Sequence, residues 1–287
     1  MTVFLNGQFV PEDQAVVSIF DRGFVYGDGV FEAVRVVNRR PFRLAAHLER
    51  FEKGAAFLKI RPAFDAQALG EAARQLIASN GLADAILRIV LSRGPGQRGY
   101  SPKNAKSPTL VMTLHPLAPL MDPAHPPEWR IITSTMRLPA GHALAQFKTC
   151  NKLAQVLARA EADEAGADEA ILPDTNGDAV ESSSGNLFWI ADKVLCTPPL
   201  ASSVLPGVTR AVVLELAHKL RLQCRETGIQ AGELSKVEGV FLSQTSVGLA
   251  ECVELDGRRL ARSPVVPELC AAYWNVVRDE CGCGQIR

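Results

Sequence analysis

The feature that most restricts the fold of this chain is a group of prolines near its middle. Residues 115–129, HPLAPLMDPAHPPEW, contain five of the 18 prolines of the chain. Proline lacks a backbone N–H and fixes φ, so this density excludes a helix or a central strand. We therefore expect a linker over 116–128, between a small N-terminal α/β lobe (1–115) and a larger C-terminal lobe (129–287).

The N-terminal lobe has the pattern of a small sheet followed by helices. Asn6-Gly7 lies between two strand-like triplets and predicts a hairpin. Apolar residues at helical spacing predict an amphipathic helix over 47–58, and a second helix is expected over about 66–79. Further strands are expected at 15–20, 30–37, 85–92 and 109–114.

The C-terminal lobe alternates loosely between strands and helices. Helices are expected over 151–165 and 208–221. Strands are expected near 130–135, 169–172, 186–190 and 239–243. The first of these helices has one apolar stripe, formed by Leu153, Val156, Leu157 and Ala160. No Rossmann fingerprint or internal repeat occurs.

Composition excludes several classes of function. The 31 Lys and Arg residues balance the 31 Asp and Glu residues, so no nucleic-acid or anionic-membrane partner is indicated. The first residues lack the pattern of a signal peptide, and no apolar run is long enough for a spanning helix. Seven scattered cysteines suggest free thiols in a reducing cytoplasm. The CGC at 281–283 lacks a nearby histidine or second cysteine pair, so no metal site is predicted.

Lys148 is a candidate reactive amine. It follows Phe147 and precedes the helix expected from residue 151. An apolar neighbour and the positive end of a helix both disfavour the charged ammonium. A neutral lysine can form a Schiff base with an aldehyde. The alternative is a surface lysine whose stem covers apolar residues while its charge stays in water.

Glu181 is the second candidate. It lies in a short strand between the turn DTNGD and the small-residue stretch SSSG. It could be a carboxylate on the solvent side of that strand. It could also be the anion that keeps a pyridine nitrogen protonated, which makes such a ring an electron sink.

The two segments around these residues, FKTCNKLAQVLARAEADEAGADEAIL and GDAVESSSGNLFWI, resemble the class IV (fold type IV) pyridoxal-phosphate enzymes. That family comprises branched-chain aminotransferases, D-amino-acid aminotransferases and 4-amino-4-deoxychorismate lyases. Further matching segments follow the family's order: 17–36, 47–51, 197–210 and 241–246. The resemblance covers residues 2 to about 257. It implies a two-lobed α/β fold like that of D-amino-acid aminotransferase, a homodimer and a pyridoxal 5′-phosphate (PLP) cofactor.

The resemblance also implies roles for individual residues. Lys148 matches the Schiff-base lysine that carries the proton, and Glu181 matches the partner of the pyridine nitrogen. Arg50 matches an arginine that holds the phosphate, although it could be an exposed helix charge. The other expected phosphate contacts are Gly207, Val208, Thr209, Thr245 and Ser246. Each of these could instead be a turn or cap residue, but a helix that begins after Gly207 would present free N–H groups to an anion.

The loop LSRGPGQRGYSP (91–102) is the expected site of substrate recognition. Arg98 can present a guanidinium to a carboxylate, and Tyr100 lies beside it. The alternative is an exposed basic turn between strands. Phe31 stands where D-amino-acid aminotransferases have a carboxylate-binding tyrosine, and Tyr26 is the fourth expected substrate residue.

Different segments of the sequence resemble members of the family that catalyse different reactions. The loop motif and Trp189 resemble the lyases, which form 4-aminobenzoate and pyruvate in the folate pathway. The segment 197–210 resembles the branched-chain enzymes. We therefore expect the lyase first, then a D-amino-acid or broad-specificity aminotransferase, then a branched-chain aminotransferase. A PLP-binding protein without turnover is the last alternative, because Lys148, Glu181 and Arg50 are all present.

Overall fold

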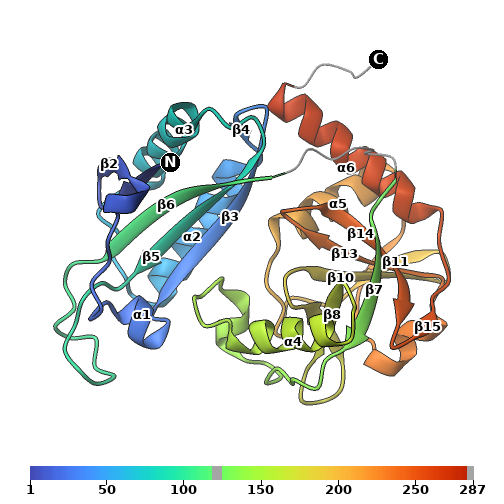
Figure 1. Cartoon of the computed structure of the whole chain (residues 1–287). Helices are drawn as coiled ribbons and strands as arrows, with labels where there is room; N and C mark the ends of the chain where they lie inside the picture. Colours follow the sequence, from blue (N-terminus) through green and yellow to red (C-terminus); the bar gives the residue numbers. More distant parts are fainter. Residues whose placement is uncertain (118–124, 283–287) are drawn as a thin grey trace. The chain divides into compact units, whose positions relative to one another are not determined.

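The structure is a computed structural model that describes residues 1–117 and 125–282 (Figure 1). The chain forms two compact units. The first unit consists of Met1–Pro119, Phe147–Asn151 and Val277–Arg287, and the second consists of Leu120–Gln146 and Lys152–Val276. Part of the predicted linker, 118–124, lies outside the described residues.

A six-stranded antiparallel sheet forms the base of the first unit, in the order β2-β1-β6-β5-β3-β4. Its strands are β1 (Thr2–Leu5), β2 (Gln8–Pro11), β3 (Gly29–Val37), β4 (Arg40–Pro41), β5 (Ala85–Ser92) and β6 (Thr109–Pro116). The hairpin predicted at Asn6-Gly7 is confirmed, since Leu5 pairs with Gln8 across it. The φ angles of 49° at Asn6 and 96° at Gly7 are in the region that these two residue types tolerate best.

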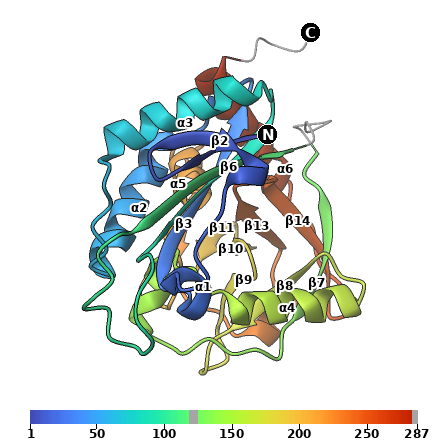
Figure 2. The same cartoon turned by 60° about the vertical axis from the view of Figure 1, so that its left-hand side comes forward.

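Two helices cover one face of this sheet, α2 (Leu44–Phe57) and α3 (Ala66–Asn80), as Figure 2 shows. Both were expected, and α2 begins three residues earlier than its pattern predicted. Leu48 and Phe51 of α2 enter the core that also contains Val34 of β3. Close apolar packing of this kind fixes how α2 lies along β3, and the polar residues of α2 are positioned with it.

The prediction of a strand at 15–20 is wrong. These residues form no strand, and Val16, Ile19 and Phe20 are exposed. The Phe20 carbonyl accepts a hydrogen bond from the Gly96 N–H of a loop, instead of joining a ladder. The short helix α1 (Arg22–Tyr26) follows, with the Asp21 side chain accepting from the Gly23 N–H at its start.

A nine-stranded sheet forms the second unit, in the order β12-β11-β10-β13-β14-β7-β8-β9, with β15 beside β14. A further pairing of β9 with β10 closes part of it like a barrel. The strands are β7 (Glu128–Thr133), β8 (Glu169–Pro173), β9 (Ala179–Ser182), β10 (Asn186–Ala191), β11 (Val194–Thr197), β12 (Cys224–Glu226), β13 (Gly239–Gln244), β14 (Gly248–Leu255) and β15 (Arg258–Arg259). The predicted mixed α/β class is therefore confirmed.

The helix expected over 151–165 is α4 (Leu153–Glu164), but its buried face differs from the predicted stripe. Leu153, Val156 and Leu157 are exposed, and Leu153 is 70% exposed. Ala158 and Ala162 are buried instead, against Ala170 and Leu172 of β8. Small side chains let the helix lie close to the strand, and the larger apolar residues then point away.

Two other helices contribute to the second unit, α5 (Val208–Lys219) and most of α6 (Val265–Cys281). α5 follows Gly207, close to its expected position, and packs against β13. α6 ends in residues that belong to the first unit. No helix in the ranges 1–117 and 125–282 is long and apolar enough to span a bilayer.

Candidate active site

A buried ion pair of the first unit contains one of the predicted phosphate residues. Glu32 on β3 is 0% exposed. Its Oε1 accepts from Arg50 Nε at 2.7 Å and its Oε2 accepts from Arg50 Nη2 at 2.8 Å. His47, one turn earlier on α2, also contacts Oε2 through Nδ1 at 2.7 Å. Arg50 is therefore not the exposed helix charge that the sequence left open.

The electrostatics of this cluster follow from its burial and its charges. Burial raises the pKa of the Glu32 carboxyl, but the charge of Arg50 and the hydrogen bonds from His47 and Arg50 outweigh it and lower this pKa to about 2. Burial also lowers the pKa of His47, and although Glu32 opposes this, the charges of Arg50 and Lys148 add to it. His47 is thus neutral at pH 7, and its Nδ1–H donates to the ionised Glu32.

Lys148 lies in a segment that is attached to β3. The Phe31 N–H donates to the Lys148 carbonyl at 2.9 Å, and the Cys150 N–H donates to the Gly29 carbonyl at 2.9 Å. Lys148 Nζ lies 4.6 Å from the centre of the Phe31 ring. The residue as a whole is half-buried. The backbone pairing fixes where this amine begins, and the aromatic face limits where it can point.

Glu181, in the second unit, is buried on β9 and is 8% exposed. Its Oε2 accepts from the Leu205 N–H at 3.3 Å, and its Oε1 accepts from Gln155 Nε2 at 3.5 Å. The solvent-facing alternative for this carboxylate is therefore wrong. A buried carboxylate held by two neutral donors is a suitable partner for a protonated ring nitrogen.

The N-terminus of α5 follows closely after Leu205, whose N–H donates to Glu181. Gly207 precedes the helix, and no side chain in the described part of the chain caps it. Val208 and Thr209, the first two helical residues, are buried. A Cβ added to Gly207 would lie 1.9 Å from Asn186 Oδ1, and Asn186 Nδ2 donates to the Leu205 carbonyl at 2.8 Å. This glycine is required for space, since its φ of −66° is ordinary.

These residues fit the phosphate of PLP. The first N–H groups of a helix have no intrahelical acceptors, and a buried, uncapped terminus attracts an anion. Ser243 Oγ, on the β13 residue that pairs with Asn186, is buried and has no hydrogen-bond partner among the described residues. Thr245 and Ser246 form the half-buried turn between β13 and β14. Hydroxyls and helix N–H groups are donors that phosphate accepts hydrogen bonds from.

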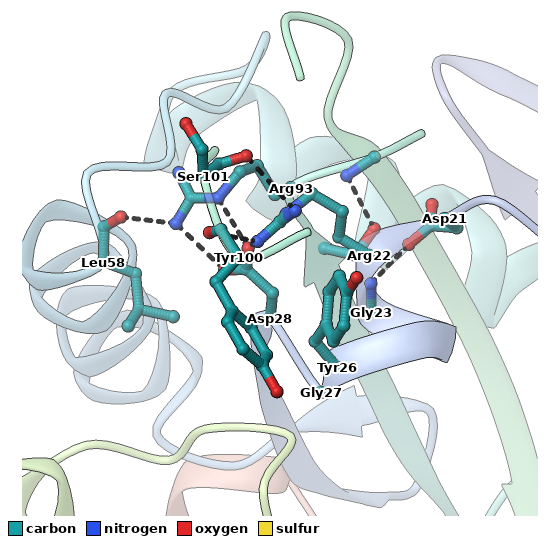
Figure 3. A network of polar contacts seen from close by, with 12 residues as sticks. Asp21, Arg22, Gly23, Tyr26, Gly27, Asp28, Leu58, Arg93, Tyr100 and Ser101 are labelled. Carbon is teal, nitrogen blue, oxygen red and sulfur yellow. Dashed lines mark hydrogen bonds and ion pairs between the residues drawn. The ribbon is translucent and has the colours of Figure 1, made fainter. Parts of the chain in front are cut away.

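The predicted substrate residues lie in the first unit. Arg98 and Tyr100 are exposed in the loop between β5 and β6, and Phe31 contacts Lys148. The ring centres of Tyr26 and Tyr100 are 5.5 Å apart (Figure 3). Each unit thus groups its own predicted residues: Phe31 with Lys148 and Tyr26 with Tyr100 in the first, and Glu181 with Gly207, Val208 and Thr209 in the second.

Several polar residues that hold these groups were not expected from the sequence. Glu32 and His47 were not predicted to pair with Arg50, and Arg22 and Asp28 were not predicted to hold the loop. A carboxylate inside the apolar run VFEAVRVV is the one signal that could have drawn attention to Glu32. Within the described residues, no group of three metal-ligating side chains occurs. Of the two cysteines in the CGC at 281–283, Cys281 is described and Cys283 lies outside the described residues.

Comparison with known proteins identifies the family. The family described as amino-transferase class IV matches residues 29–255. A protein of Methanocaldococcus jannaschii, provisionally named branched-chain-amino-acid aminotransferase, is 35% identical over 258 residues, which cover 90% of this chain and 89% of that protein. A D-alanine aminotransferase of Staphylococcus aureus is 30% identical over 267 residues, which cover 92% of this chain and 93% of that enzyme.

Solved structures are similar over nearly the whole chain. The branched-chain amino acid aminotransferase of Escherichia coli has a TM-score of 0.91 and 27% identity, with 99% of this chain and 97% of that chain covered. Another branched-chain amino acid aminotransferase, solved with pyridoxamine 5′-phosphate, also has a TM-score of 0.91, with 28% identity and with 97% of this chain and 94% of that chain covered. A protein of Legionella pneumophila, provisionally named 4-amino-4-deoxychorismate lyase, has a TM-score of 0.85 and 25% identity, with 92% of this chain and 97% of that chain covered.

Proposed function

Because this chain belongs to the amino-transferase class IV family, we propose that Lys148 is the residue that bonds to its PLP cofactor and carries the reacting proton. Members of the family use PLP, and this chain is a PLP-dependent aminotransferase or lyase. The observation that carries the proposal is the placement of Lys148. Its backbone is hydrogen-bonded to β3, its amine lies 4.6 Å from the Phe31 ring, and its charge is close enough to lower the pKa of His47.

PLP, when bound, supplies an aldehyde that condenses with a primary amine and a ring that withdraws electrons from the carbon bearing that amine. In our proposal the amine of Lys148 removes the proton from the substrate Cα, acting as a general base. The Glu181 carboxylate holds a proton at the pyridine nitrogen. The N–H groups of Val208 and Thr209 are proposed to bind the phosphate. Arg50 is proposed, separately, as a phosphate-binding guanidinium. The hydroxyls of Thr245 and Ser246 are proposed as further phosphate donors.

Glu32 and His47 support this arrangement without contacting the reacting atoms. Glu32 holds two nitrogens of Arg50 and so fixes the plane of its guanidinium. His47, being neutral, can bond to Glu32 without adding a second positive charge beside Lys148. The cluster therefore keeps the Arg50 guanidinium oriented for an anion.

For the reaction itself, we infer 4-amino-4-deoxychorismate lyase activity as the first candidate. The supporting observations are the RGYS motif at 98–101, whose backbone is held by α1, and the similarity to the Legionella protein. In this reaction the substrate loses pyruvate and its ring becomes 4-aminobenzoate. Arg98 and Tyr100, with Tyr26 and Phe31, are the residues proposed to recognise a carboxylate-bearing amine.

An amino-acid aminotransferase is the second candidate. It is supported by the higher sequence identity to the Methanocaldococcus and Staphylococcus proteins, whose names give branched-chain and D-alanine specificity. Both reactions require the same first proton transfer by Lys148, so the proposed residues serve either one. They differ in what happens to the substrate afterwards, and this difference can be measured directly.

One panel of reactions distinguishes the candidates. Purified holoenzyme is mixed with aminodeoxychorismate, D-alanine or L-leucine, and the cofactor absorbance and the products are followed. Release of 4-aminobenzoate and pyruvate supports the lyase. Bleaching of the cofactor band by either amino acid, without product from aminodeoxychorismate, would replace the lyase by an aminotransferase. A protein that binds PLP and reacts with none of the three would contradict both.

The attachment point of the cofactor is tested separately. Borohydride reduction followed by peptide mass mapping is expected to find the cofactor on Lys148. The K148A variant should lose this label, and the neighbouring K152A variant should keep it. A reducible cofactor bond that persists in K148A would contradict the proposal.

We further propose that the protein is a cytoplasmic homodimer. Five apolar side chains between residues 16 and 24 of the first unit are exposed, and Phe24 is 78% exposed. The five are Val16, Val17, Ile19, Phe20 and Phe24. A second copy that covers them would remove this surface from water. Light scattering is expected to give twice the monomer mass, and F20E/F24E is expected to give the monomer. A monomeric wild type would contradict the proposal. The cytoplasmic location is proposed because cysteines remain thiols in a reducing compartment.

A further inference from the structure

Arg22 holds the loop that carries Arg98 and Tyr100. It is the first residue of α1 and is 4% exposed. Its Nε donates to Asp28 Oδ2 at 2.8 Å. Its Nη1 donates to the Gly99 carbonyl at 2.8 Å and the Ser101 carbonyl at 3.4 Å, and its Nη2 donates to the Tyr100 carbonyl at 3.0 Å (Figure 3). One guanidinium thus fixes three successive peptide groups.

Tyr26 holds the same segment through a second set of contacts. Its Oη accepts from the Gly99 N–H at 3.0 Å, and its ring lies 4.8 Å from the Arg22 guanidinium. Gly99 has a φ of 110°, which other residues rarely adopt, so the chain turns sharply there. The backbone around residues 99–101 is therefore fixed, while the side chain of Tyr100 is 87% exposed. A fixed backbone with exposed side chains is what a recognition loop requires.

Asp28 is shared between Arg22 and a second arginine. Arg93 donates to both carboxylate oxygens of Asp28, from Nε at 2.7 Å and from Nη2 at 2.9 Å. The remaining bonds found for the Arg93 guanidinium in the described residues go to the Leu58 and Lys59 carbonyls. Burial raises the pKa of Asp28, but the hydrogen bonds from Arg93 and Arg22 outweigh it and lower this pKa, so Asp28 is ionised. Of these two arginines, Arg22 is the one that extends from this carboxylate to the loop at 99–101.

We propose that Arg22 is a positioning residue for recognition of the substrate carboxylate. It acts through the backbone of residues 99–101, which it holds in the conformation that presents Arg98 and Tyr100. The inference rests on the role of Arg98 proposed above. It adds that specificity for a carboxylate depends on a buried arginine that never contacts the substrate, and that Asp28 orients this arginine.

The test separates binding of the carboxylate from binding of the amine. L-leucine and D-alanine carry both groups, whereas 3-methylbutylamine and ethylamine carry only the amine. Every primary amine that binds at the cofactor changes its absorbance, whether the enzyme is a lyase or an aminotransferase. Apparent affinities from this change are measured for wild-type holoenzyme and for R22M, R22K, R98A and R22M/R98A. R22M keeps the aliphatic stem and removes the donors, and R22K keeps the charge but cannot reach three carbonyls.

We expect R22M to weaken amino-acid binding about ten- to a hundredfold, the range for losing a charge-assisted hydrogen bond. The two amines should bind within about twofold of the wild type, since they lack the group that is recognised. R22K should resemble R22M. The double variant R22M/R98A should bind amino acids no more weakly than R98A, because the two changes remove the same contact with the carboxylate.

R93M is the matched control. It also removes an arginine from Asp28 but leaves the bonds from Arg22 to the loop, so the ratio of amino-acid to amine affinity should not change. Equal weakening of amino acids and amines by R22M would show a general structural role and overturn the inference. Weak binding by R98A beside unchanged binding by R22M would overturn the inference alone. Unchanged binding by R98A would overturn the proposed role of Arg98 and the inference with it.

Discussion

Replacing Glu32 by glutamine tests whether the buried cluster of Glu32, Arg50 and His47 is held by charge. The substitution keeps the shape of the side chain and removes its negative charge, leaving the Arg50 guanidinium without its ionic partner. A pKa lowered from 4.5 to about 2 means that the folded state favours the carboxylate. At about 1.4 kcal/mol per pH unit, this preference amounts to about 3 kcal/mol at pH 7.

The dependence on pH has a definite sign. The pKa of Glu32 is lower in the folded than in the unfolded state, so its contribution is complete above about pH 4.5 and is lost as the pH falls toward 2. By the same relation, about 1 kcal/mol should remain at pH 3. The difference in unfolding free energy between wild type and E32Q should therefore shrink by about 2 kcal/mol between pH 7 and pH 3.

Urea unfolding of the PLP-free proteins, repeated between pH 7 and pH 3, measures this difference. The cofactor is omitted because any ligand of the folded state adds its own stabilisation. The matched control is E49Q on the exposed side of α2, where Glu49 pairs with Lys53 at 2.6 Å. A solvated pair of this kind should give no measurable change at any pH. A wild-type-minus-E32Q difference that is the same at pH 7 and pH 3 would refute the ionic account of the cluster.

Other predictions concern the second unit. G207A should weaken PLP binding about ten- to a hundredfold, because its Cβ would lie 1.9 Å from Asn186 Oδ1 and displace the start of α5; G232A, which has open space, should bind PLP normally. Equal PLP affinity in both variants, measured by titration of the cofactor absorbance, would contradict the phosphate site. E181Q should slow removal of the Cα proton at least about a hundredfold while PLP still binds, and stopped-flow absorbance checks this. A wild-type rate in E181Q would remove Glu181 from the mechanism.

Local patterns in the sequence were sufficient for much of the fold. Asn6-Gly7 predicted a hairpin because few residues other than asparagine and glycine accept its positive φ angles. The helix expected over 66–79 appeared as α3, with Asp65 as its cap. The residues 15–20 look like a strand but form none. Alternating apolar residues are compatible with a strand, and a strand also needs a neighbour to accept its hydrogen bonds.

The candidate site shows the same division. The resemblance of individual segments named Lys148, Glu181, Arg50 and the residues at the start of α5, but it could not say how each is held. Burial decided between the alternatives for Glu181 and Arg50, since one has 8% exposure and the other forms a buried ion pair with Glu32. In α4 the tertiary contacts reversed the prediction, because close packing on β8 selected the alanines over the larger apolar residues.

By itself, the sequence determined the class of fold and the family, because these depend on local patterns and on which side chains are present. Only the tertiary structure decided that Glu32 orients Arg50, that the segment of Lys148 pairs with β3, and that Arg22 reaches the carbonyls of residues 99–101. The bonds of Arg50 to Glu32 and of Arg22 to Ser101 join residues that are 18 and 79 positions apart. The physical reason is that a charge finds its partner through packing in three dimensions, and no periodicity along the chain records that choice.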